Sequence, residues 1–150
     1  MPASDFLARL GRNILYGFRR ELRPYEASII EAVASRITDA DQATINAQLV
    51  ARERVQRWNS DRMVLLSVPR GASLPLLSAR NTDHCMAKVR VESPQGKLVA
   101  KLMSHRGLLS SLEFSKPPKS LLGSNFVVTS VELSPAEPGH DAGVDAEEHG

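Results

Sequence analysis

The chain has 150 residues, of which 42% are hydrophobic and 24% are charged, with a formal net charge of +2 and a single cysteine. These values exclude a wholly disordered chain, a collagen-like chain and a small disulfide-stapled domain. A chain of this length buries roughly two thirds of its unfolded surface, so its core needs no metal or disulfide. No apolar run approaches the roughly 18 residues that span a bilayer, and we expect a cytoplasmic protein without a transmembrane segment.

The charge is distributed unevenly along the chain. Residues 1–133 carry +7 and residues 134–150 carry −5. The latter segment has two prolines, three glycines and no aromatic residue, so it cannot bury enough apolar surface to order itself. We therefore expect one domain at 1–133, helical over 1–60 and β over 61–133, followed by a disordered acidic tail. Such a tail either solubilises the protein or shields a basic surface of the same molecule, and both interpretations stay open.

Three helices are predicted in the first 60 residues. From Asp5 to Arg23, apolar residues recur every four positions and form one stripe opposite several arginines. A second helix follows Pro24, and a third begins at Thr38 or Asp39, whose side chains can cap its backbone amides, and continues through Trp58. The first helix packs on the domain core or lies on an anionic membrane, and the sequence leaves both alternatives open.

After residue 60 the hydrophobic period changes to two, which predicts five strands of a largely antiparallel sheet. These strands span residues 63–68, 84–92, 97–105, 108–115 and 126–133. The connection at 69–83 is long for a compact domain and is therefore a candidate functional loop. The predicted fold is α+β, with three helices packed on one face of the sheet.

The turn Ser93-Pro94-Gln95-Gly96 sets the register of one hairpin. Counting outward from Glu92 opposite Lys97 predicts a mostly apolar core face made of Cys85, Ala87, Val89, Val91, Leu98, Ala100, Leu102 and Ser104. The other face then carries Lys88 opposite Lys101, Arg90 opposite Val99, Met86 opposite Met103 and His84 opposite His105. Like charges directly opposite each other are mildly destabilising, so the lysines either splay into water or serve an anionic contact.

Possible catalytic and metal sites are weak in this sequence. Imidazole and thioether groups form a soft ligand set for monovalent copper, but nearby lysines disfavour a cation, so we expect no metal or cofactor. The register separates Cys85 from both histidines, which disfavours a Cys–His nucleophilic pair, and Glu113 falls on the basic side of the sheet as a balancing charge. The motifs CxxC, GxGxxG, GxxxxGK(S/T), HExxH and GxSxG are absent. The candidate copper ligands are His84, Met86, Met103 and His105.

The sequence favours a noncatalytic binding protein of the immunity or adaptor kind, whose basic sheet face engages an acidic protein or another anion. A nucleic-acid binder with a winged-helix-like helix pair and a basic hairpin is the alternative, although residues 24–60 have a net charge of −1. A small enzyme with a site assembled from distant residues and a homodimer that covers the sheet face also stay open. The expected binding residues supply charge and adaptable apolar contact: Lys88, Arg90, Lys101, Arg106, Met86 and Met103.

Overall fold

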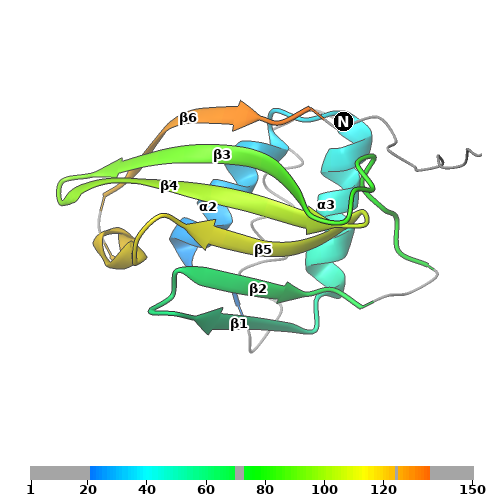
Figure 1. Cartoon of the computed structure of the whole chain (residues 1–150), viewed down its shortest axis with the longest axis horizontal. Coiled ribbons are helices and arrows are strands. Elements are labelled where there is room, and N and C mark those ends of the chain that lie inside the picture. The colour runs from blue at the N-terminus through cyan, green and yellow to red at the C-terminus, as the bar shows by residue number, and fades with distance from the viewer. Residues whose placement is uncertain (1–20, 70–72, 124, 136–150) are drawn as a thin grey trace, which may run out of the picture.

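The computed structural model describes residues 21–69, 73–123 and 125–135, and these form an α+β fold with an antiparallel sheet, as predicted. Two helices and six strands lie in this part of the chain (Figure 1). The elements are α2 (Pro24–Ala34), α3 (Asp39–Ala51), β1 (Arg54–Trp58), β2 (Met63–Ser67), β3 (His84–Ser93), β4 (Gly96–His105), β5 (Leu108–Phe114), the 3₁₀ helix η1 (Pro118–Leu121) and β6 (Val127–Leu133).

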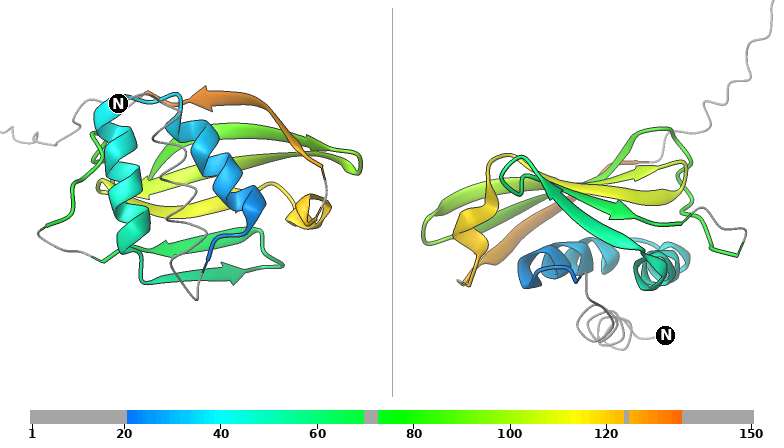
Figure 2. Two further views of the ribbon diagram at one scale, coloured as in Figure 1. Left: turned by 180° about the vertical axis from the view of Figure 1, so that it is seen from behind. Right: turned by 90° about the horizontal axis from the view of Figure 1, so that it is seen from below.

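The six strands form one sheet in the order β1-β2-β5-β4-β3-β6, and every neighbouring pair is antiparallel. Both helices lie against the same face of this sheet, and neither lies on the other face (Figure 2, right). The β3–β4 hairpin is inside the sheet, so it does not project from the molecule as a wing. The winged-helix outline that the sequence suggested therefore differs from this topology.

The two helices begin as the sequence predicts. Pro24 occupies the first turn of α2, and the backbone N–H of Arg23 donates to Oε1 of Glu26 at 2.7 Å. Thr38 caps α3 by accepting a hydrogen bond from the backbone N–H of Asp41 at 3.2 Å. The buried faces of these helices place Ile29, Ile30, Val33, Ile45 and Leu49 against the sheet with no exposed surface.

Two predictions about the other helices have different outcomes. Residues 5–20 of the predicted first helix lie outside the described chain, and residues 21–23 are not helical. The predicted continuation of the third helix through Trp58 is wrong, because α3 ends at Ala51 and β1 pairs with β2. Val55 and Arg57 face the helices, while Gln56 and Trp58 face away. The inward residue Arg57 is polar and the outward residue Trp58 is apolar, so the sequence shows no alternating hydrophobic pattern here. The sheet therefore has six strands where five were predicted.

The hairpin register is confirmed from Glu92 opposite Lys97 back to Ala87 opposite Leu102. Beyond that point a β-bulge between Cys85 and Ala87 shifts the pairing by one residue. The predicted pairs that involve the residues before the bulge are therefore wrong. His84 faces Ser104 and Cys85 faces Met103, and Met86 has no single partner on β4. The bulge consequently moves His84 and Met86 to the helix side of the sheet, where they are 9% and 8% exposed.

The described part of the 69–83 connection is tied to the domain. Leu77 is 1% exposed, and its backbone N–H donates to the carbonyl of Gly107 at 2.9 Å. Ser78 donates its backbone N–H and its hydroxyl to the carboxylate of Asp41 at 3.0 and 2.6 Å. These contacts fix the segment beside the first turn of α3. Neither α2 nor α3 is long and apolar enough to cross a membrane.

Candidate binding surface

We call the sheet face that carries no described helix the open face (Figure 2, right). Because side chains alternate along each strand, the register assigns every second residue to it. One row of residues crosses all six strands, and each residue in it is the register partner of the next one on the neighbouring strand. In sheet order, the residues of this row are Trp58, Met63, Glu113, Lys101, Lys88 and Glu132.

Three exposed cations lie together near the middle of the open face, and we call them the basic cluster: Lys88, Arg90 and Lys101. Lys88 and Lys101 are directly opposite on β3 and β4, and Arg90 is the next residue along β3 on the same face. Among the described residues, none of these three side chains has an ion-pair or hydrogen-bond partner. The structure therefore leaves a like-charged pair unneutralised at the surface, although such a pair is mildly destabilising.

Carboxylates on neighbouring strands make the open face less basic than the sequence suggested. Glu113 is opposite Lys101 and Glu132 is opposite Lys88, so an acidic residue flanks each lysine. Glu113 accepts a hydrogen bond from the hydroxyl of Ser111 at 3.0 Å and lies on the basic side of the sheet, as predicted. The basic cluster is thus a cationic centre within a face of mixed charge.

The open face is hollowed next to the basic cluster. A hollow of about 250 Å³ lies on β3 and β4 toward their shared turn. Lys97 lies 4.0 Å from the carboxylate of Glu92, and these two exposed side chains form one wall. The cations Arg90 and Lys97 at this hollow can accept a carboxylate-bearing side chain whose alkyl stem covers Val99, although Glu92 adds one negative charge to the same lining. The open-face residues that line the hollow are Arg90, Glu92, Lys97, Val99 and Ser115.

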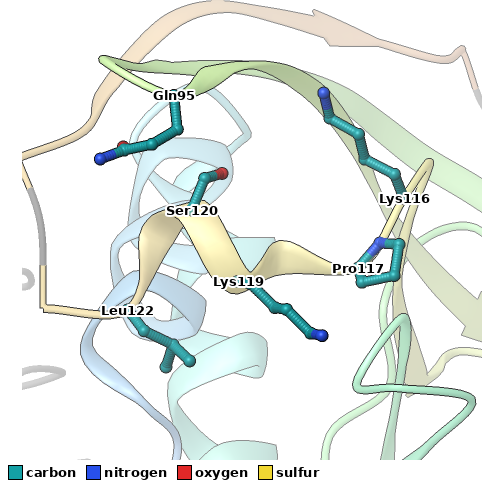
Figure 3. A pocket seen from close by; sticks show the side chains of 6 residues that line it. All are labelled: Gln95, Lys116, Pro117, Lys119, Ser120 and Leu122. Atoms are coloured by element: carbon teal, nitrogen blue, oxygen red, sulfur yellow. The ribbon is translucent and has the colours of Figure 1, made fainter.

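A second hollow, of about 440 Å³, lies between the tip of the β3–β4 hairpin and η1 (Figure 3). The segment after β5 reaches this tip because Ser115 exchanges hydrogen bonds with the backbone of Val99, at 3.0 and 2.8 Å. Two lysines there, Lys116 and Lys119, add positive charge to the same end of the sheet. The sequence pattern of 116–125 predicts only a connection between two strands, so it gives no signal for these lysines. The lining residues are Gln95, Lys116, Pro117, Lys119, Ser120 and Leu122.

The structure separates two of the other predicted binding residues, Met86 and Arg106, from the basic cluster. Met86 lies on the helix side of the sheet, whereas Met103 stays on the open face. Arg106 occupies the β4–β5 turn with a φ of 51°, at the end of the sheet opposite the β3–β4 tip (Figure 1). Four residues lie between it and Lys101, and five steps of about 3.3 Å each give a distance of about 17 Å. The fold therefore brings together four of the predicted residues, Lys88, Arg90, Lys101 and Met103.

The four candidate copper ligands do not form one group. His84 and Met86 lie on the helix side, whereas Met103 and His105 lie on the open face. His105 instead approaches the carboxylate of Asp83, with Nδ1 and Oδ1 3.4 Å apart. Residues 21–69, 73–123 and 125–135 also contain no group of three or more histidine, cysteine, aspartate or glutamate residues that could hold a metal ion.

Cys85 is not the buried core residue that the sequence predicted. The bulge turns it to the open face opposite Met103, where it is half-buried, and its thiol donates weakly to the carbonyl of Ala87 at 3.6 Å. No base lies within hydrogen-bond distance of this thiol in the part of the chain that the structure describes. The geometry around Cys85 does not form a nucleophile–base pair.

Comparisons of the chain with protein-family models, with curated proteins and with solved structures found no match.

Proposed function

We propose that the chain is a noncatalytic binding protein whose open face engages an acidic protein partner through the basic cluster of Lys88, Arg90 and Lys101. The observation that carries this proposal is the cross-strand pair Lys88–Lys101, which is exposed and has no ion-pair partner among the described residues. A partner carboxylate between the two ammonium groups would relieve their repulsion. Such relief needs no rearrangement of the sheet.

The apolar side chains of the open face favour a protein partner. Trp58 is 57% exposed and Met63 is 37% exposed, and both lie in the same cross-strand row as the two lysines. Aromatic residues and methionine are enriched in protein interfaces, whereas lysine is depleted from their centres. We therefore expect apolar contact on β1 and β2 and charged contact on β3 and β4.

The binding test uses a fluorescent polyglutamate peptide as the acidic probe and fluorescence anisotropy as the readout. Lys88→Gln/Arg90→Gln/Lys101→Gln should weaken binding by about three-fold to one hundred-fold, because three exposed ion pairs of about 0.2–1 kcal/mol each sum to about 0.6–3 kcal/mol. The binding should also weaken as salt rises, because salt screens exposed charges. The variant is not expected to lose stability, since all three side chains are exposed.

A charge-matched control distinguishes the basic cluster from net charge alone. Arg36→Gln/Arg80→Gln/Arg106→Gln removes three cations that lie outside the cluster. Equal loss of affinity in both triple variants would contradict the proposal. A single-stranded DNA probe of similar length serves as the second arm, and binding of DNA that greatly exceeds binding of polyglutamate would favour a nucleic-acid binder instead.

The predicted acidic tail gives the same experiment a further arm. Residues 134–150 carry five acidic residues and no lysine or arginine. If the tail shields the basic cluster, a chain that ends at Leu133 should bind polyglutamate more tightly than the full chain, and the difference should fall at high salt. Equal affinities would leave the tail a solubilising role only.

A further inference from the structure

A cavity of about 230 Å³ lies on the helix side of the sheet, away from the open face. It is open to solvent and is bordered by the α2–α3 connection, the first turn of α3, the segment 77–79, and the ends of β3 and β6. Its volume is below the range of about 300–1,000 Å³ that is typical of sites for drug-sized ligands, so it fits a smaller molecule. The apolar part of its lining consists of Ile37, Leu77, Ala79, Met86 and Leu133.

The imidazole of His84 lines this cavity and is only 9% exposed. It has no hydrogen-bond or ion-pair partner among the residues that the structure describes. The hydroxyl of Ser104, directly opposite His84 on β4, is also buried without a partner in this part of the chain. An unsatisfied buried polar group costs about 1–3 kcal/mol. This cost falls on the Ser104 hydroxyl, whereas the imidazole of His84 borders the cavity and can hydrogen-bond to a molecule that enters it.

The β-bulge at the start of β3 places His84 there. Without the bulge between Cys85 and Ala87, the alternation of β3 would put His84 and Met86 on the open face, as the sequence predicted. Bulges often occur where a strand redirects a side chain toward a functional site. Here the bulge brings one polar and one apolar side chain to the same cavity wall.

Two opposite charges complete the lining. The carboxylate of Asp41 is held by two hydrogen bonds from Ser78, which leaves it acceptor sites for a further donor. Arg36 is exposed and forms no ion pair with any described residue. The cavity lining therefore contains one anion (Asp41), one cation (Arg36) and one imidazole (His84), together with apolar side chains.

We propose that this cavity binds a small zwitterion with an apolar side chain, of the chemical class of the aliphatic α-amino acids. The ammonium group pairs with Asp41, the carboxylate accepts hydrogen bonds from Arg36 and His84, and the side chain covers Leu77 and Met86. The cavity and the basic cluster lie on opposite faces of the sheet, so this proposal does not depend on the proposed function.

Isothermal titration calorimetry of the full chain with leucine tests the proposal. We expect saturable binding of leucine, and binding at least about ten-fold weaker for 4-methylpentanoate, which lacks the ammonium group, and for 3-methylbutylamine, which lacks the carboxylate. Arg36→Gln and His84→Gln should each weaken leucine binding about ten-fold. Lys101→Gln, on the open face, is the control and should leave leucine binding unchanged.

Three results would overturn the proposal. They are the absence of saturable binding up to about 10 mM leucine, equal binding of leucine and both analogues, and equal loss in Arg36→Gln and Lys101→Gln. His84 is buried, so its variant is compared with the parent by circular dichroism before titration. Arg36 is exposed, and Arg36→Gln keeps the test decisive if His84→Gln does not fold.

Discussion

Glu26 has a carboxylate with no exposed surface, and its position explains how the first described helix is held to the sheet. Arg57 of β1 donates to both of its oxygens, from Nε at 2.9 Å and from Nη2 at 2.5 Å. The backbone N–H of Arg23 donates to the same carboxylate at the start of α2. One side chain therefore caps α2 and joins it to the edge strand β1.

Removal of the cation from this pair should be costly. Arg57→Met leaves the carboxylate of Glu26 buried without its charged partner, which lowers the free energy of unfolding by about 3–5 kcal/mol. Urea unfolding measures this loss. Glu26→Gln and the double variant complete a cycle in which the two losses should couple by about 1 kcal/mol or more. Strict additivity would show that the pair does not act as a unit.

Glu31 predicts a dependence of stability on pH. Burial raises the pKa of this carboxyl group above its ordinary value. The folded pKa of Glu31 lies above its unfolded pKa, so protonation of this group favours the folded state. Its contribution to the free energy of unfolding is fully present below the unfolded pKa and is lost as pH rises through the folded pKa. Glu31→Gln should therefore increase the free energy of unfolding at pH 7, by less than about 1 kcal/mol because water screens a half-exposed group.

The same substitution should have little effect at about pH 3.5, where the carboxyl group is largely protonated in both states. Urea unfolding of the parent and Glu31→Gln at pH 7 and pH 3.5, about one unit below the ordinary pKa, gives the comparison. A variant that is less stable than the parent at pH 7 would contradict the expected sign, because it would show that the surroundings of Glu31 stabilise its carboxylate.

At the scale of elements, Gln48 connects α3 to the turns at one end of the sheet. Its side chain is fully buried, and Nε2 donates to the carbonyls of Pro75 and Gly107, both at 2.9 Å. Its Oε1 accepts from the backbone N–H of Leu109 at 2.8 Å. One amide thus satisfies backbone groups of the 73–83 segment, the β4–β5 turn and β5.

Gln48→Leu should leave the buried backbone N–H of Leu109 without its partner, whereas the carbonyl of Gly107 keeps the hydrogen bond from the backbone N–H of Leu77. We expect a loss of about 1–3 kcal/mol in the free energy of unfolding, which is the cost of one unsatisfied buried group. Limited proteolysis should also cut the 73–83 segment faster. Gln56→Leu, on the open face of β1, is the matched control and should change neither measurement. Unchanged cleavage in Gln48→Leu would contradict this account.

The sequence predicted the elements whose hydrophobic period is clear. The helix after Pro24 and the strands from Met63 onward were found because one face of each is buried in the core. β1 was missed because Val55 and Trp58 fit a helical spacing equally well, and only pairing with β2 decides between the two. The bulge in β3 was missed because no residue type specifies it. The surroundings of His84 were therefore predicted wrongly, because the bulge decides which face of the sheet His84 occupies.

At the scale of the whole molecule, the single sheet separates two different surfaces. On one side, α2 and α3 cover the sheet (Figure 2, left), and the cavity beside His84 lies at the α2–α3 connection. On the other side, the open face presents the basic cluster, its flanking carboxylates and the exposed Trp58. Since the two sides share only the backbone of the sheet, we expect binding at one side to proceed independently of the other.

The most direct test of the central proposal locates the bound acidic probe on the sheet. Two-dimensional amide NMR spectra of the isotope-labelled full chain are recorded during titration with polyglutamate. We predict chemical-shift changes in residues 88–92 and 97–103, which fall when salt is added. Changes confined to α2 and α3, or spread evenly over all exposed cations, would contradict the assignment of the open face as the binding surface.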